Sequence, residues 1–186
     1  MAFRPFYTDS KVFRYQSGVL RSELGYWKKN VIGGSMTMKK HLVSDANLRQ
    51  PSGGFYDALA LWPDLAAVTD LIHHRLDIGF YYDLASFLGL SPKGLFVLLS
   101  VPAVVQRRWS KAGQLTVGEG DYAYRQALVI RDALALFEGD KKGTVLWLTQ
   151  ANRALNGFPP GRLLSTFVGI DTVTKLIWKI ENGVSL

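Results

Sequence analysis

The side chains best suited to chemistry in this sequence lie in a short basic run at residues 103–112, which reads AVVQRRWSKA. Arginine presents a planar fork that matches guanine O6 and N7, and glutamine pairs with adenine N6 and N7. If the run is helical, we expect Gln106 and Arg107 to reach base edges, while neighbouring cations contact phosphates. An alternative interpretation is a solvated basic face on a scaffold that only packs and dimerises. The predicted DNA-contacting residues are Lys93, Gln106, Arg107, Arg108, Ser110 and Lys111.

Groups that suggest catalysis are sparse. Asp70 precedes the adjacent His73 and His74, but adjacent histidines point to different sides of a helix, and His41 lies far away in sequence. Residues 33–35 read Gly-Gly-Ser and lack the strand, lysine and helix of a phosphate loop. The sequence therefore predicts a protein that is not an enzyme and uses no cofactor and no metal.

Composition fits a folded protein with an anionic partner. The chain has 186 residues, of which 48% are hydrophobic and none is cysteine, and its formal net charge is +7. A positive surface favours nucleic acid, because lysine and arginine that neutralise phosphates release condensed counterions. The start of the chain lacks the apolar core of a signal peptide, and no apolar run approaches the roughly 18 residues that span a bilayer. We therefore expect a cytoplasmic protein with no membrane association.

The chain is expected to have three parts. Residues 1–54 scatter basic side chains among glycines and aromatics, which predicts a weakly ordered arm, either a solvated tail or a segment that binds nucleic acid. From Phe55 onward apolar residues recur three and four apart, and almost nothing alternates with period two, which predicts an all-α fold. Residues 55–116 and 117–186 are expected to form a DNA-binding part and a C-terminal part.

Local signals place the helices of the middle part. Gly89 is expected to end one helix, Ser91 with Pro92 to begin the next, and Pro102 to begin a third that ends at Gly113. Short helices joined in this order have the arrangement of a helix-turn-helix. The residues of the third helix expected to pack inward are Val101, Val105, Trp109 and Ala112.

This middle part resembles the helix-turn-helix of the Xre/MbcA/ParS antitoxins of bacterial toxin–antitoxin pairs. The residues that carry this resemblance are Leu88, Gly89, Leu90, Ser91, Leu98, Leu99, Val101, Pro102, Arg108, Gly113, Leu115 and Thr116. Ser100 replaces the usual turn glycine, and Trp109 replaces a second arginine. These departures bear on operator binding more than on the fold.

The C-terminal part resembles the toxin-binding domain of the same family. The residues that carry the resemblance are Phe137, Trp147, Leu148, Asn152, Leu155, Gly157, Leu163, Leu164, Thr166, Gly169, Val173, Ile180, Gly183 and Val184. Thr116 and Glu119 form a possible capping box at the start of a long connecting helix. Asp171 is the expected N-cap of the last helix, from which Trp178 points outward as a contact anchor or packs on a neighbouring helix.

The resemblance implies an antitoxin that binds and neutralises a cognate toxin, most commonly a RES-domain toxin that consumes NAD, and that represses its own promoter. We expect a homodimer, because helix-turn-helix proteins commonly read two half-sites; Tyr122 and Tyr124 are candidate contacts unless they complete the core. The alternative is a stand-alone transcriptional regulator with no toxin partner. The expected toxin-binding residues are Trp147, Asn152, Leu155, Trp178, Glu181, Asn182, Gly183 and Val184.

Overall fold

The computed structural model describes residues 49–74 and 76–184, all of which lie in a compact unit spanning Ser35–Leu186. The predicted all-α fold is confirmed, since the described residues form helices and no strand. Most of the predicted arm lies outside the described residues, but its last part does not form a tail. Ser52 caps the first described helix, and Gly53 and Gly54 are its first residues.

The helices follow one another with short connections. Their bounds are α3 (Gly53–Ala60), α4 (Leu65–His73), α5 (Gly79–Leu88), α6 (Pro92–Leu98), α7 (Ala103–Ala112), α8 (Val117–Leu136), α9 (Lys141–Thr149), the 3-10 helix η1 (Arg153–Leu155), α10 (Pro160–Leu163) and α11 (Phe167–Glu181). None of the described helices is long and apolar enough to cross a membrane.

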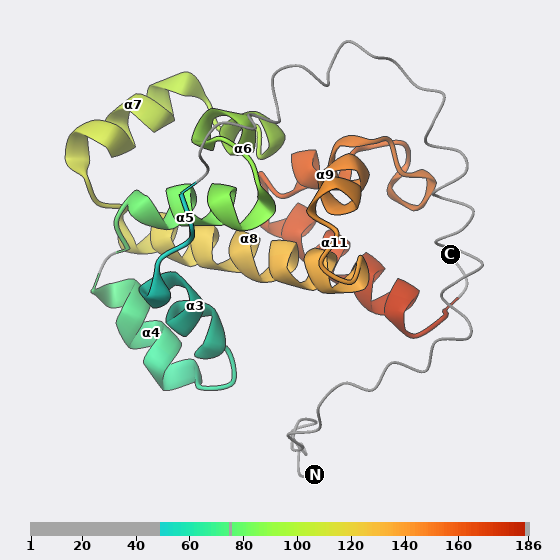
Figure 1. The fold of residues 1–186 in the computed structure, drawn as a ribbon, viewed down its shortest axis with the longest axis horizontal. Helices are drawn as coiled ribbons and strands as arrows, with labels where there is room; N and C mark the ends of the chain where they lie inside the picture. The colour runs from blue at the N-terminus through green and yellow to red at the C-terminus, as the bar shows by residue number, and fades with distance from the viewer. Residues whose placement is uncertain (1–48, 75, 185–186) are drawn as a thin grey trace. The chain divides into compact units, whose positions relative to one another are not determined.

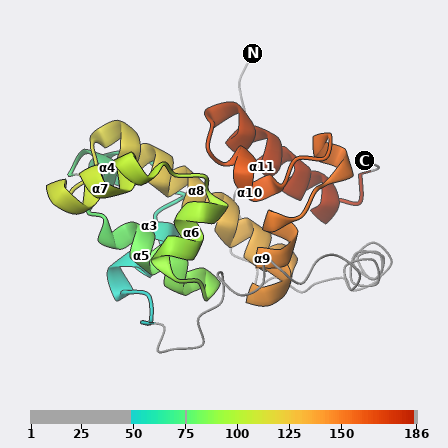
Figure 2. The ribbon, with the colours of Figure 1, turned by 90° about the horizontal axis from the view of Figure 1, so that it is seen from above.

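Helix α8 is the element on which the others pack. It contacts α3, α4 and α5 on one side and α9 and α11 on another, and Figures 1 and 2 show it running between these two groups. Its buried residues occur around much of its circumference, as expected for a helix covered from several directions. The predicted capping box is confirmed, because Thr116 and Glu119 bond reciprocally at its N-terminus.

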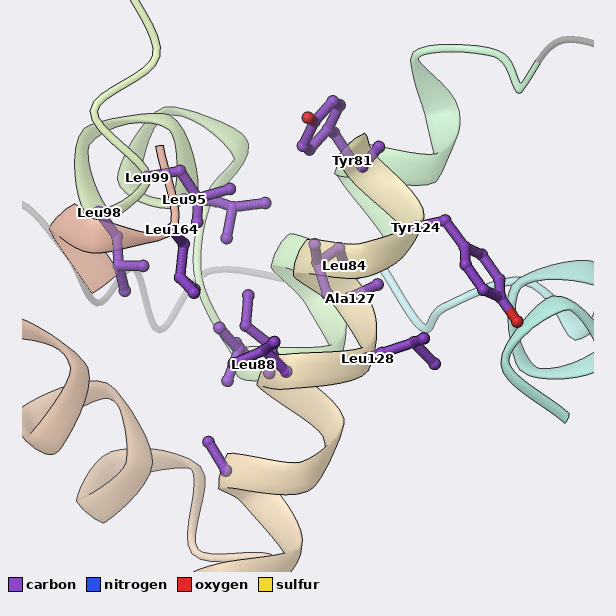
Figure 3. Packing of buried hydrophobic residues seen from close by; sticks show 14 of the residues in the cluster. Tyr81, Leu84, Leu88, Leu95, Leu98, Leu99, Tyr124, Ala127, Leu128 and Leu164 are labelled. Atoms are coloured by element: carbon purple, nitrogen blue, oxygen red, sulfur yellow. The ribbon is translucent and has the colours of Figure 1, made fainter. Parts of the chain in front are cut away.

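One continuous core joins the middle and C-terminal parts of the chain. Leu95 and Leu98 of α6, with Leu99 directly after it, lie close to Leu164, which follows α10 (Figure 3). Each of these side chains is at most 5% exposed. The predicted boundary between residues 116 and 117 therefore coincides with the start of α8, across which apolar packing is uninterrupted.

The predicted ends of α5, α6 and α7 are confirmed. Gly89 and Gly113 are left-handed C-caps with φ of 73° and 71°, and the Ser91 hydroxyl accepts a hydrogen bond from Gly94 N. Ser100, in the turn between α6 and α7, adopts φ 56°. A non-glycine residue in this region costs about 1–2 kcal/mol, so the tight turn is held by the packing around it.

Two predictions about the last helix have different outcomes. The prediction of Asp171 as the N-cap is wrong, because α11 begins a turn earlier with Thr166, whose hydroxyl accepts from Gly169 N at 3.0 Å. A Cβ on Gly169 would lie 1.9 Å from Leu163 O, so glycine is what permits this helix start. Asp171 instead pairs with Lys175 one turn along the helix. The prediction that Trp178 lies off the buried stripe is confirmed, since the residue is 58% exposed.

Candidate functional site

The buried contact of helix α7 with the rest of the fold is centred on an aromatic residue. Trp109 is the buried residue of this helix, and its ring stacks on Tyr81 of α5 at 5.0 Å between centroids with an interplanar angle of 14°. Val101 and Val105 are half-buried, in line with the prediction that they pack inward. Ala112 was predicted to pack inward and is exposed, because the chain leaves the core at the end of α7.

The basic side chains predicted to contact DNA are exposed. Arg107 and Lys111 project from α7, and Lys93 lies in the first turn of α6. Ser110 is exposed as well, although its hydroxyl donates to Gln106 O at 3.0 Å and so is used within the helix. The structure thus places cations on the solvent side of the helix that Trp109 anchors.

The prediction that Gln106 reads bases does not fit its surroundings. Gln106 is half-buried, and its Nε2 donates to Val101 O at 2.8 Å. The amide therefore braces the turn before α7 and points away from the exposed side. Helical spacing alone left this residue near the boundary between the two faces, and the backbone acceptor decides its orientation.

Arg108, one of the predicted DNA contacts, forms an ion pair with Glu119 at the start of α8. The same carboxylate oxygen accepts a hydrogen bond from Trp109 Nε1 at 2.9 Å, and the other oxygen accepts from Thr116 N and Oγ1. Burial alone would raise the pKa of Glu119, but these hydrogen bonds and the Arg108 charge outweigh it and lower the pKa. Glu119 therefore joins α7 to α8, and Arg108 contributes its charge to this contact.

Glu119 was recognised from the sequence only as a helix cap. Its contact with Arg108 spans eleven positions in the chain, and it depends on how α7 returns toward α8. The spacing of residues within one helix cannot predict such a contact between two helices. The sequence signal that does exist is the capping-box motif, which places a carboxylate at the start of α8.

In the C-terminal part, the predicted contact residues divide by burial. Trp147 is 6% exposed and packs on Phe137, with ring centroids 6.0 Å apart. Leu155 is 5% exposed. These side chains are core residues of this part, and the prediction that they touch a partner directly does not fit their burial.

Asn152 is also buried and organises the loop that follows α9. Its Oδ1 accepts from Ala154 N at 2.9 Å, its carbonyl accepts from Gly157 N, and its N–H donates to Phe158 O at 3.3 Å. Both ends of the loop are therefore tied to one residue. Asn152 fixes the shape of the surface on which Phe158 is 49% exposed.

The remaining predicted contacts lie at the exposed end of α11, which we call the C-terminal face: Trp178, Glu181, Asn182, Gly183 and Val184. Each of these residues is exposed, and Asn182 Nδ2 donates to Trp178 O at 2.7 Å. Partial loss of hydration beside the chain, with repulsion from Asp132, raises the pKa of Glu181. The structure therefore brings Trp178 together with the predicted contact residues that follow it.

A hollow of about 260 Å³ lies at the other end of α11. Leu155, Phe158, Val168 and Thr172 are among the residues that line it. Val168 is 77% exposed and Phe158 49%, so apolar surface extends from this hollow onto the outside of α11. The outer side of α11 thus carries exposed apolar residues near both ends.

Comparison with known proteins finds a similarity for this part of the chain. Residues 132–183 match the model of the antitoxin Xre/MbcA/ParS C-terminal toxin-binding domain, which here runs from the end of α8 through α11. The resemblance to Xre-type antitoxins is confirmed. A protein named antitoxin Xre from Photorhabdus laumondii subsp. laumondii is 35% identical over 78 residues, which are 42% of this chain and 53% of the relative. An antitoxin Xre from Yersinia enterocolitica is 28% identical over 133 residues, 67% of this chain and 90% of the relative.

The match to the Xre/MbcA/ParS domain includes both kinds of C-terminal residue. The buried Trp147, Asn152 and Leu155 fall inside it, as do Trp178 and the residues that follow as far as Gly183. Within residues 49–74 and 76–184, no group of three or more histidine, cysteine, aspartate or glutamate side chains is placed to hold a metal ion. His41 lies outside the described residues, and His74 Nδ1 bonds with Asp70 O.

The two tyrosines predicted as candidate dimer contacts make contacts within the chain. Tyr124 is 1% exposed, and its hydroxyl donates to Ala58 O at 2.9 Å, so it completes the core. Tyr122 is half-buried and packs edge-on against Phe167. Tyr124 is therefore unsuited to a subunit interface, and Tyr122 offers little free surface.

Proposed function

We propose that this chain is an antitoxin that neutralises a cognate toxin through the C-terminal face. The observation that carries the proposal is the exposed Trp178, which lies on the last helix of the Xre/MbcA/ParS domain. A large aromatic that the fold leaves in water is the kind of residue that dominates binding energy at interfaces. The mode of action is binding, with no catalytic step required of this chain.

The proposed partner is a RES-domain toxin that consumes NAD. The support is the resemblance to Xre-type antitoxins, with Trp178 as the exposed anchor that such a partner would contact. The buried Trp147, Asn152 and Leu155 would hold the neighbouring loop in shape without touching the toxin.

A truncation tests this assignment. Ending the chain after Ile180 removes the tail and leaves the buried Val173, Leu176 and Ile177 in place, so the fold is expected to survive. When the truncated chain is co-expressed with the toxin encoded by the neighbouring gene, we expect loss of growth protection. Full protection by the folded truncated protein would show that the residues after Ile180 are not required. Full protection by a folded truncated protein that also carries Trp178→Ala would move the toxin site away from the C-terminal face.

We further propose that α7 enters the major groove of the promoter of its own operon, which requires a cytoplasmic protein. Arg107 is the proposed base reader, and Lys93 and Lys111 the phosphate contacts. Arg107→Ala is expected to cost about 1–3 kcal/mol of DNA-binding free energy and to relax sequence specificity at one base position. Lys111→Ala is expected to weaken binding to all DNA sequences alike and to reduce the slope of log affinity against log salt concentration by about one. Unchanged binding after both substitutions would refute the assignment.

A homodimer is the proposed DNA-binding form, because a two-fold dimer places two α7 helices about one DNA turn apart. Light scattering of the free chain and of its complex with DNA tests this, and a strict monomer in both would refute it. The second candidate function is a stand-alone transcriptional regulator, which the basic α7 alone would support. Such a regulator would bind DNA normally and show no affinity for the neighbouring gene product.

A further inference from the structure

The outward side of α7 contains an apolar residue among its cations. Val104 is 68% exposed in the first turn of the helix. At about 100° per residue, Val104, Arg107 and Lys111 fall within a sector of roughly 60°, and Trp109 lies nearly opposite. The three side chains therefore project directly away from the core into which Trp109 is anchored.

The other polar residues of α7 are already used within the fold. Gln106 donates to Val101 O, Ser110 donates to Gln106 O, and Arg108 pairs with Glu119. Within the described part of the chain, no hydrogen bond or ion pair holds Arg107 or Lys111. The side that remains available combines one valine with two cations.

A partner for this side must be anionic and must also offer an apolar group that fits a single valine. The major groove of DNA has both, since phosphates line its edges and thymine presents its C5-methyl group to apolar side chains. A single valine is too small an apolar face to hold a helix at a membrane surface, which requires an apolar stripe. Duplex DNA is the occupant that satisfies charge and shape together.

We propose that Val104 determines sequence specificity by packing on a thymine methyl group, next to a guanine read by Arg107. This inference rests on the proposed operator binding. It adds a second base to those that the protein recognises, and this base is selected by apolar contact and not by hydrogen bonding. Three helical residues rise about 4.5 Å and one base step about 3.4 Å, so the thymine lies within roughly two base pairs of the guanine. Val104 replaces Gln106 as the second base reader of α7.

The test uses the full chain and a pool of random duplexes, from which the preferred sequence is selected. Each thymine of that sequence is then replaced singly by deoxyuridine, which removes the methyl group and changes nothing else on the groove edge. Affinity is measured by fluorescence anisotropy for the natural protein, for Val104→Ala and for Val168→Ala. Val168 is a matched control, since it is an exposed helical valine on α11.

At one thymine we expect replacement by deoxyuridine to lower the DNA affinity of the natural protein and of Val168→Ala by roughly three- to fivefold. This is the effect of losing the burial of one methyl group. Val104→Ala is expected to bind both duplexes equally. Alanine favours the helix more than valine does, so circular dichroism should show an intact fold. Insensitivity of the natural protein to every replacement, or the same sensitivity in Val104→Ala, would overturn the inference while leaving operator binding intact. Failure to bind or select any duplex would instead overturn operator binding itself.

Discussion

Replacing Glu119 by glutamine removes the charge that joins α7 to α8. The carboxylate accepts from Trp109 Nε1 at 2.9 Å and from Thr116 N at 3.0 Å through different oxygens, and it pairs with Arg108. Glutamine has one acceptor oxygen, so it can retain only one of these two partners. The variant therefore leaves a donor unpaired and also breaks the ion pair.

The expected loss of stability follows from these contacts. Leaving a buried donor such as the Trp109 indole unpaired costs about 1–3 kcal/mol. The Arg108 side chain is 57% exposed, so its ion pair adds at most about 1 kcal/mol. A total near 2 kcal/mol corresponds to a fall in Tm of about 4–8 °C for a chain of this size.

The pH dependence of stability distinguishes this mechanism from general damage. The folded pKa of Glu119 is lowered, so its stabilisation is present above the ordinary glutamate pKa and is lost as pH falls through the folded value. Urea unfolding should show a constant difference between wild type and Glu119→Gln near neutral pH, which shrinks below about pH 4. Asp121→Asn breaks an exposed pair with Arg125 and is the control, with an expected loss under about 0.5 kcal/mol. An equal loss in both variants, or a difference that does not shrink in acid, would refute the reasoning.

Three further outcomes follow from the surroundings of single residues. Gln126→Leu leaves a buried tyrosine hydroxyl and a backbone carbonyl unpaired and should cost about 2–4 kcal/mol in urea unfolding; a loss under about 1 kcal/mol would contradict it. Gly169→Ala drives a Cβ into Leu163 O and should lower Tm sharply, whereas Gly118→Ala, with open space around its Cβ, should raise it slightly; the reverse order would show that α11 starts differently. The pKa of Glu181 is raised in the folded chain, so its negative charge opposes folding once the pH rises through that pKa. Glu181→Gln should therefore raise Tm slightly at neutral pH and leave Tm unchanged in acid. A lower Tm at neutral pH would contradict this.

The sequence was most informative where structure depends on a few adjacent residues. Gly89, Ser91 with Pro92, and Thr116 with Glu119 each act through their own backbone or a neighbour within one turn, and all were predicted correctly. Asp171 shows the limit of such reasoning. It is a good N-cap by type, but Thr166 is one as well, and the backbone approach that Gly169 permits decides between them.

Sequence reasoning about the site reached its limit where the orientation of a side chain depends on distant parts of the chain. Gln106 and Arg108 lie on a basic helix, and sequence alone gave no sign of the carbonyl and the carboxylate that engage them. Trp147 matched the motif of a binding domain, but such a motif also contains the core residues that shape the surface. Exposure separates the two kinds, and exposure is a property of the folded chain.

The most direct test of the antitoxin assignment is the affinity of this chain for the toxin encoded by the neighbouring gene, measured by isothermal titration calorimetry. Trp178→Ala is compared with Trp62→Ala, because the two tryptophans are similarly exposed, at 58% on α11 and 55% in the turn between α3 and α4. The proposal predicts a tight complex that Trp178→Ala weakens by about 2 kcal/mol or more, roughly thirtyfold, and that Trp62→Ala leaves unchanged. No detectable complex with the natural chain would contradict the antitoxin function, and equal affinity of all three proteins would contradict the C-terminal face as its site.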